Sequence, residues 1–358
     1  MISNLNFPAI FSFGFRIEKI ILCAMLCSFT YLCVAQPTII MLDSTVGNLD
    51  SGVVLSKTSF RGLSVVDDDI IWVSGSKGTF AKSIDGGNHF YYNRIKGYEQ
   101  SDFRDIEAFD ANSAIVMSSG TPAVILKTLD GGQTWREAFR KNDSAYFLDA
   151  MDFWNTKRGV IVGDPIASHF VLLQTIDGGE TWQELDTTQT PQAIIGEAVF
   201  AASGTSLRCW GKAKFSFVSK SNLFLFKDFH LTSVIPLTLL INNLSANAGA
   251  FSLSKYKNGI CIVGGDYTMD TAKLGVSTFV SERGVFQQKS TTCFGYRSCV
   301  EYIGENDFIA CGTGGIDMYL NNEWKNISSQ SFHVVRKGKN GKSVFLAGSK
   351  GRIGKLVN

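Results

Sequence analysis

The sequence of 358 residues predicts an all-β fold in which one unit of about 46 residues is repeated around a ring. The first observation behind this prediction is a turn motif, Ser/Thr-x-Asp-Gly-Gly. Its aspartates, Asp85, Asp130 and Asp177, stand 45 and then 47 residues apart. The second observation is a succession of short apolar runs at similar spacing, which continues after the turn motif is lost. Short, evenly spaced strands with periodic glycine and aromatic residues are typical of a β-propeller.

The turn motif has a structural explanation in its own residues. Aspartate can accept hydrogen bonds from backbone N–H groups within the turn, and glycine adopts positive φ at little steric cost. An apolar run precedes each turn and an aromatic residue follows it, which predicts a β-hairpin. The first copy has His89-Phe90 where the others have Thr-Trp. We therefore assign a structural role to the motif residues, which are Asp85, Gly87, Asp130, Gly132, Trp135, Asp177, Gly179 and Trp182.

Seven units can be followed along the chain. Each is expected to begin with a strand led by an aromatic residue, such as 60–63, followed by a very apolar strand, such as 70–75. Units four to seven lose the turn motif, and unit four, with expected strands at 197–202, 207–211 and 215–218, is the least regular. Unit seven lacks an outermost strand, which the apolar segment 38–42 can supply. We predict a seven-bladed β-propeller of four-stranded blades, with the ring closed by this N-terminal strand. A linear solenoid, the alternative, would need polar caps that the sequence does not show.

The N-terminus is predicted to be a targeting segment. Arg16 and Lys19 precede an apolar run over 20–34 that is too short to span a bilayer comfortably, and Ala35-Gln36 is a plausible cleavage point. We divide the chain into a signal peptide, residues 1–35, and a single propeller domain, residues 36–358. A membrane anchor is the alternative for the first segment. The expectation is export to the periplasm or the cell exterior, with no transmembrane span after cleavage.

Composition and motifs narrow the classes of ligand. The formal net charge of +2 indicates neither a nucleic-acid partner nor a generally acidic one. The basic residues are not interleaved with aromatic ones as in a nucleic-acid-binding surface. No Gly-x-Gly-x-x-Gly follows an expected strand, and no Cys–His spacing suits zinc. We therefore expect no nucleic acid, no cofactor and no metal.

Five cysteines remain after the predicted cleavage: Cys209, Cys261, Cys293, Cys299 and Cys311. Export allows disulfides. Cys293 and Cys299 are close enough in sequence to pair, and free thiols are the alternative. Cys261 and Cys311 stand in apolar runs, which favours buried thiols.

With the units laid out, the chain resembles the seven-bladed Asp-box (bacterial neuraminidase repeat) propellers related to the photosystem II stability/assembly factor. The resemblance rests on the three turn motifs together with 60–63, 72–75, 264–267 and 348–356. It implies a non-enzymatic binding or assembly role, and it implies that the Asp box is a structural turn between the outer two strands of a blade. Nothing in the chain itself implies a photosynthetic role.

The repeat alignment brings distant residues to one face of the ring. In a propeller the first strand of each blade lines the central channel. The position after the leading aromatic is occupied, in units one, two, three, six and seven, by Arg61, Arg104, Leu148, Arg297 and His333. Units six, seven, one and two are consecutive around a closed ring, so three arginines and a histidine would form a cationic arc. Asp164 and Asp266, at the ends of second strands, and nearby Glu197 are expected on the same face.

Guanidinium donors suit carboxylate or phosphate, so this arc predicts a site for an anionic group or for an acidic loop of an unidentified protein partner. The alternative is that each arginine pairs with a local carboxylate, such as Asp105 or Asp149, and braces neighbouring blades. We assign no catalytic residue. The enzyme alternative is a sialidase-like glycoside hydrolase, for which Tyr296, Glu197 and Asp164 are candidates that no motif ties together. The expected protein is a monomeric, non-enzymatic interaction or assembly module.

Overall fold

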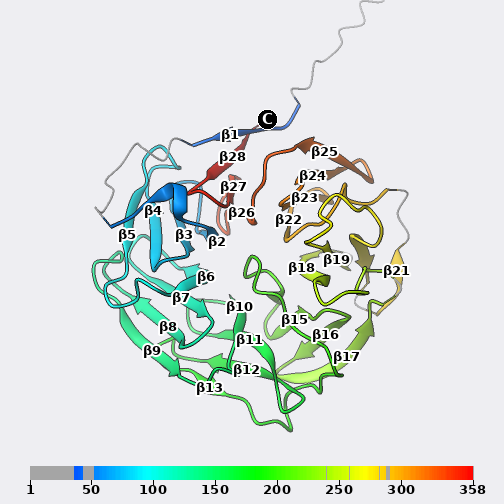
Figure 1. The fold of residues 1–358 in the computed structure, drawn as a ribbon, viewed down its shortest axis with the longest axis horizontal. Coiled ribbons are helices and arrows are strands. Elements are labelled where there is room, and N and C mark those ends of the chain that lie inside the picture. Colours follow the sequence, from blue (N-terminus) through cyan, green and yellow to red (C-terminus); the bar gives the residue numbers. More distant parts are fainter. Residues whose placement is uncertain are drawn as a thin grey trace, which may run out of the picture. The chain divides into compact units, whose positions relative to one another are not determined.

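The computed structural model describes residues 36–42, 52–238, 240–257, 259–281, 283–287 and 291–357. The predicted signal peptide, residues 1–35, lies outside the described residues. Residues Pro37–Asn358 form one compact unit. Within it, seven antiparallel sheets of four strands each stand around a central channel, so the predicted seven-bladed propeller is confirmed (Figure 1).

The strands of a blade follow one another along the chain, from the channel outward. Blades one to three consist of β2 (Phe60–Val65), β3 (Ile71–Gly75), β4 (Thr79–Ser83) and β5 (Tyr91–Arg94); β6 (Asp102–Ala108), β7 (Ala114–Ser119), β8 (Ala123–Thr128) and β9 (Arg136–Lys141); and β10 (Leu148–Phe153), β11 (Gly159–Ile166), β12 (His169–Thr175) and β13 (Gln183–Glu184). Blades four to six consist of β14 (Leu207–Trp210), β15 (Lys214–Val218), β16 (Asn222–Lys227) and β17 (His230–Pro236); β18 (Ala248–Tyr256), β19 (Gly259–Asp266), β20 (Ser277–Val280) and β21 (Phe286–Gln287); and β22 (Cys299–Gly304), β23 (Asp307–Gly312), β24 (Gly315–Leu320) and β25 (Glu323–Ser328). A single 3-10 turn, η1 (Leu55–Lys57), is the only helix in the described ranges.

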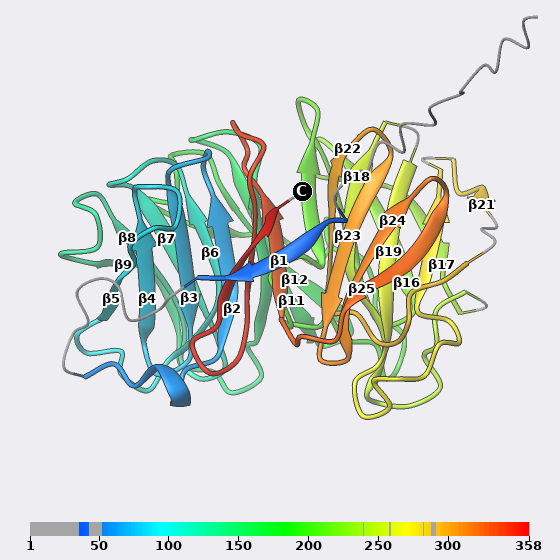
Figure 2. The ribbon, with the colours of Figure 1, turned by 90° about the horizontal axis from the view of Figure 1, so that it is seen from above.

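Blade seven closes the ring as predicted. Its strands are β26 (Val334–Lys337), β27 (Val344–Ala347), β28 (Ile353–Val357) and, on the outside, the N-terminal β1 (Thr38–Met41). β1 pairs antiparallel with β28, from Thr38 opposite Val357 to Met41 opposite Gly354, and Figure 2 shows the two strands side by side. Two ends of the chain therefore complete one sheet.

Blade four differs from its predicted layout. The segment 197–202 was expected to be its inner strand, but it forms no strand, and β14 (Leu207–Trp210) takes the inner position instead. The backbone of this segment is held by polar contacts: Val199 N–H donates to Asp164 Oδ1 at 2.8 Å. Segment 197–202, which is not part of any strand, leads into the part of the chain that enters the channel.

The Asp-box turns join each blade to the one before it. In the second box Thr134 N–H donates to Asp130 Oδ1 at 2.9 Å, and the hydrogen bonds from Thr134 lower the pKa of Asp130 to about 2. Lys82 Nζ in blade one donates to the carbonyl oxygen of Gly131 at 3.0 Å. A Cβ on Gly132, whose φ is +90°, would lie 2.6 Å from the Phe80 ring of blade one. Glycine is therefore required for the blades to approach this closely.

The same lysine contact recurs at two further blade junctions. Lys127 Nζ donates to the carbonyl of Gly178 at 2.7 Å, and Lys355 Nζ donates to that of Gly86 at 3.3 Å. The three Asp boxes thus act as structural turns on the outer part of the ring.

No disulfide joins any two of the five cysteines in the described part of the chain, so the Cys293–Cys299 pairing that the sequence left open is not formed. Cys299 on β22 lies opposite Cys311 on β23, and both thiols are buried. Cys293 packs in a different cluster together with Cys261. The pairing of β22 with β23 places Cys299 in blade six, in a different cluster from Cys293.

Segment 201–206 crosses the channel and contacts blades two, five and six. Ser203 Oγ donates to the carbonyl of Ser298 in blade six at 2.8 Å, and the hydroxyls of Thr205 and Ser252 in blade five lie 2.6 Å apart. On the other side, a Cβ on Gly204 would lie 2.2 Å from the carboxyl carbon of Asp105 in blade two. The channel is therefore divided into two separate cavities, one at each end.

Candidate functional site

One cavity, of about 340 Å³, lies at the end of the ring where the inner strands begin. We call this end the arginine mouth. Its cationic and imidazole side chains are Arg61, Arg104 and His333, from blades one, two and seven. Its walls are largely aromatic and aliphatic, formed by Phe147, Val199, Phe200, Ala201, Ala202, Phe251, Tyr267, Tyr296 and Thr313.

Both arginines at this mouth donate to backbone carbonyls of the channel-crossing segment, and Arg104 also pairs with a carboxylate. Arg61 Nη1 donates to the carbonyl of Ala202 at 3.2 Å, and it forms no ion pair with any described residue. Arg104 Nη1 donates to the carbonyl of Ala201 at 3.4 Å, and its Nε lies 2.8 Å from Asp102 Oδ2. Burial, with a further contribution from Arg104, lowers the pKa of Arg61, but guanidinium keeps its charge throughout the ordinary pH range. Among the described residues Arg61 therefore has no carboxylate in contact, and the only carboxylate whose charge acts on it is the more distant Asp102.

His333 lies in the same cavity but carries no charge at neutral pH. Burial lowers its pKa to about 3, and the positive charges of Arg61 and Arg104 act in the same direction. The sequence analysis counted this histidine in a cationic arc. Its imidazole instead supplies hydrogen-bonding capacity beside the guanidinium of Arg61 in the next blade.

Arg297 does not join Arg61 and Arg104. Its side chain is fully buried, with Nε 2.8 Å from Asp317 Oδ2 and Nη1 donating to the carbonyl of Tyr296. The strand register explains the difference. Gly62 pairs with Ser74, just before Gly75, whereas Cys299 pairs with Cys311, just before Gly312.

Cys299 therefore matches Gly62, and Arg297 matches the buried Phe60 rather than Arg61. A shift of one residue moves a strand side chain to the other face. By the same register the blade-three residue that matches Arg61 is Asp149, and not Leu148, which matches Phe60. Asp149 is fully buried, and burial raises its pKa well above the usual range.

The three predicted acids lie near this end without lining the cavity. Asp164 Oδ1 accepts from Val199 N–H, and burial raises its pKa to about 6. Asp266 accepts from the hydroxyls of Thr268 and Ser245, and so closes a turn. Glu197 accepts from the side-chain amide of Asn222 at 3.3 Å. All three hold local backbone or side chains.

The geometry required of a sialidase-like enzyme is not assembled here. Tyr296 lines the arginine mouth, but Glu197 and Asp164 are absent from the lining of that cavity. Burial raises the pKa of Tyr296, which is the opposite of what a phenolate nucleophile requires. Among the described residues, no three His, Cys, Asp or Glu side chains are arranged to hold a metal ion.

A second cavity, of about 300 Å³, lies at the opposite end, where the inner strands finish. We call it the mixed-charge mouth. Each blade contributes one residue from the equivalent position of its inner strand, three residues after the position of Arg61: Ser64, Glu107, Asp152, Arg208, Ser254, Glu301 and Arg336. At about 3.3 Å per residue, the two rings of side chains are roughly 10 Å apart along the strands.

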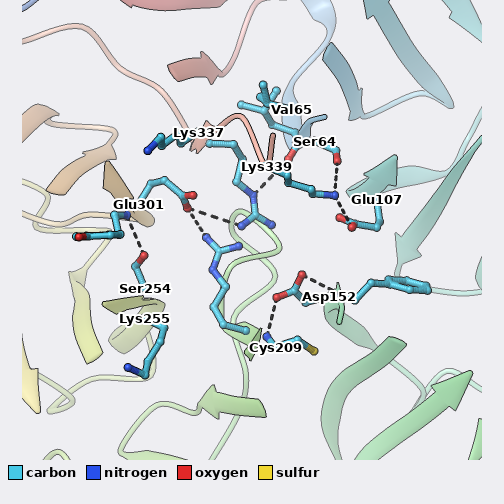
Figure 3. A pocket seen from close by; sticks show the side chains of 15 residues that line it. Ser64, Val65, Glu107, Asp152, Cys209, Ser254, Lys255, Glu301, Lys337 and Lys339 are labelled. Carbon is cyan, nitrogen blue, oxygen red and sulfur yellow. Dashed lines mark hydrogen bonds and ion pairs between the residues drawn. The ribbon is translucent and has the colours of Figure 1, made fainter. Parts of the chain in front are cut away.

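Most charges at the mixed-charge mouth are paired with one another (Figure 3). Arg208 Nη2 lies 2.7 Å from Glu301 Oε2, and Arg336 Nη1 lies 3.9 Å from the same oxygen. Lys339, from the loop after β26, forms an ion pair with Glu107 and donates to Ser64 Oγ at 3.2 Å. Burial raises the pKa of Glu301 to about 7, against the opposing effect of Arg208. Sequence analysis missed this ring, although the spacing of three from Arg61 could have located it once the register was known.

The comparisons with known proteins agree with this architecture. A family model described as photosynthesis system II assembly factor YCF48 matches residues 100–195, which include blades two and three. The structure described as YCF48 bound to D1 peptide superposes with a TM-score of 0.60 at 14% identity, covering 91% of this chain and 96% of that one. YCF48 from Cyanidioschyzon merolae gives 0.59 at 14%, covering 89% and 98%. The Neurospora crassa Pan2 WD40 domain gives 0.61 at 12%, covering 89% and 94%.

No curated protein matches the chain significantly. At these identities the solved structures show the fold alone, and the family model supplies the link in sequence. In the described ranges no helix has the length and apolar character needed to cross a membrane. The resemblance predicted from the sequence is confirmed, and the chain is a seven-bladed Asp-box β-propeller related to the YCF48 assembly factor.

Proposed function

We propose that this propeller is an exported, non-catalytic interaction module that binds an acidic segment of a protein partner at the arginine mouth. The relation to an assembly factor and the likeness to WD40 propellers support a role in protein interaction or assembly. One solved structure of similar fold is described as bound to a peptide, which supports a protein ligand for this propeller as well. The acidic chemistry rests on this chain's own residues.

The observation that carries the proposal is the state of Arg61. Its guanidinium lines an open cavity, and its one hydrogen bond within the described residues goes to a neutral carbonyl. Arg104 adds a second guanidinium whose Nη1 is also held by a carbonyl. Carbonyl contacts fix the direction of a guanidinium without neutralising it, so Arg61 is preorganised for a carboxylate.

The walls of the cavity add apolar recognition beside the charge. The rings of Phe200 and Phe251 stack with centroids 3.9 Å apart, and Tyr296 meets Phe251 edge-on at 4.8 Å. These packed rings lower the local dielectric, which strengthens an arginine–carboxylate contact. A bound segment is expected to place one carboxylate near the arginines and an apolar side chain against the rings.

The binding test uses a fluorescein-labelled peptide rich in Asp and Glu and a matched peptide in which these are Asn and Gln. We expect the wild type to prefer the acidic peptide and the Arg61→Gln/Arg104→Gln variant to lose at least about tenfold in affinity for it. The control is Arg136→Gln/Arg140→Gln on the outer strand β9, whose arginines already pair with Glu180 and Glu137. Equal affinities for the two peptides, or equal losses in the two variants, would overturn the proposal.

Export is tested separately by N-terminal sequencing of the protein isolated from its native cells. The expected mature N-terminus is Gln36, in the envelope or the medium. A chain that starts at Met1 inside the cell would contradict export and would leave the peptide-binding result standing.

A further inference from the structure

The mixed-charge mouth, at the end of the channel away from the proposed peptide site, is a polarised cavity. Glu107 and Asp152 come from neighbouring blades two and three. Figure 3 shows them on one side of the cavity and Glu301 on the other. Glu301 holds the guanidinium groups of Arg208 and Arg336. One wall thus consists mainly of carboxylates. The other presents the guanidinium groups of Arg208 and Arg336, which both contact the carboxylate of Glu301.

The guanidinium wall retains unused donors. Arg208 uses Nε for the carbonyl of Leu253 and Nη2 for Glu301. Arg336 uses Nε for the carbonyl of Leu63, and its Nη1 makes only the long contact of 3.9 Å with Glu301. Nη1 of Arg208 and Nη2 of Arg336 have no hydrogen-bond partner among the described residues, and both side chains line the cavity. Two positive charges share one negative charge here.

The carboxylate wall retains a negative charge, that of Asp152, which Arg208 and Lys339 oppose only from a distance. Asp152 Oδ1 accepts from Phe153 N–H at 2.9 Å, and Oδ2 accepts from Cys209 N–H at 2.7 Å. Within the described part of the chain it forms no ion pair, and each oxygen keeps a second lone pair for another donor. Glu107 beside it forms an ion pair with Lys339. This wall is therefore suited to one cationic or N–H-rich group.

We propose that the mixed-charge mouth binds a small zwitterion, a molecule with a carboxylate at one end and an ammonium group at the other, of the size of an amino acid. The cavity has a volume of about 300 Å³ and a low dielectric. A simple anion bound in it would be repelled by Asp152, and a simple cation would be repelled by Arg336. A zwitterion meets a complementary charge at both walls. Its carboxylate contacts Arg208 and Arg336, and its ammonium group contacts Asp152.

The test compares three probes with related skeletons: L-alanine, propionate without the ammonium group, and ethylammonium without the carboxylate. Binding is measured by titration calorimetry at pH 8, above the pKa of about 7 to which burial raises Glu301. We expect alanine to bind saturably and each single-charge probe to bind at least about tenfold more weakly. No saturable alanine binding, or alanine binding no tighter than propionate, would overturn the proposal.

Two variants separate the walls. Asp152→Asn should bring the affinity for alanine down to that for propionate, whereas Arg336→Gln should bring it down to that for ethylammonium. Glu107→Gln is the substitute on the acidic wall if Asp152→Asn does not fold, as judged by its thermal unfolding. Arg61→Gln/Arg104→Gln is the matched control and should bind alanine as the wild type does, so this result is independent of the peptide experiment. If Asp152→Asn and Arg336→Gln both still bind alanine more tightly than the single-charge probes, as the wild type is expected to do, the proposed zwitterion site is contradicted.

Discussion

The two ends of the channel differ in how many charged side chains line them and, more importantly, in how those charges are satisfied. At the arginine mouth, Arg61 and Arg104 are oriented by carbonyl groups, and one acid, Asp102, partners Arg104. At the mixed-charge mouth, carboxylates and cations pair across the cavity. The difference teaches that a count of charged residues says little about binding. What matters is whether the fold supplies the counter-charge or leaves it to a ligand.

The largest predicted effect concerns the segment that keeps the two mouths apart. Gly204 has φ of +66°, and a Cβ there would lie 2.2 Å from the carboxyl group of Asp105. That carboxyl is fixed by N–H groups of Ile106 and Met151, both at 2.8 Å, and has little room to move. Gly204→Ala should cost about 3 kcal/mol or more of unfolding free energy, measured by urea denaturation.

The matched control for that change is Gly211, which has φ of +59° and open space, with no atom within 4 Å, where a Cβ would stand. Gly211→Ala should cost only about 1 kcal/mol, from the backbone conformation alone. Equal costs at the two glycines would show that the crossing segment does not pack as described.

The second prediction uses the acid of the mixed-charge mouth. The pKa of Glu301 is raised to about 7 in the folded protein, above the value near 4.5 of the unfolded chain. The folded state therefore binds the extra proton, and stability decreases as pH rises through this window. Between pH 5 and pH 8 the loss from this group is about 2.5 kcal/mol. Glu301→Gln should remove this part of the slope, and an unchanged pH profile would contradict the assignment.

The third prediction concerns His333 at the arginine mouth, whose contribution to the free energy of unfolding has the opposite pH dependence to that of Glu301. The pKa of His333 falls on folding from its ordinary value of 6.5 to about 3, so the unfolded state binds the extra proton. Stability is then lost as pH falls below about 6.5, by about 2 kcal/mol between pH 7 and pH 5. The difference between wild type and His333→Gln in urea unfolding at these two pH values isolates the effect. A variant that loses as much stability in acid as the wild type would refute it.

The smallest predicted effect is a gain in binding. Asp102 lies 2.8 Å from Arg104, and both side chains are about 30% exposed. Asp102→Asn should free Arg104 from its competing carboxylate and raise affinity for the acidic peptide about threefold, the scale of one partly exposed ion pair. Fluorescence polarisation measures the change. A decrease in affinity would mean that Asp102 acts as a positioning residue for Arg104.

Much of the fold was predictable because it depends on local, periodic signals. The three Asp boxes gave the period, the apolar second strands gave the blades, and 38–42 supplied the missing strand in blade seven. Blade four was placed one strand too early because its apolar segment 197–202 has the composition of a strand. The conformation of this segment depends on its contact with Asp164, a residue of blade three.

The site was predictable only in part, because it depends on register and burial. Arg61 and Arg104 follow a true leading phenylalanine, and the structure brings them together with His333. Arg297 follows Tyr296, which lies outside the strand, so the apparent match was displaced by one residue. The neutral state of His333 depends on burial by neighbouring blades. The mixed-charge mouth could not be predicted, because locating its residues requires the register of all seven inner strands.

The most direct test of the account is to locate the bound acidic peptide by hydrogen–deuterium exchange of the backbone amides. The arginine mouth predicts that the peptide slows exchange in 199–202 and around Tyr267 and Tyr296. It also predicts no change in the loop 338–343 at the mixed-charge mouth. Protection confined to 338–343, or spread over the outer Asp-box turns, would contradict the central claim that Arg61, which no described carboxylate pairs with, and Arg104 beside it define the partner site.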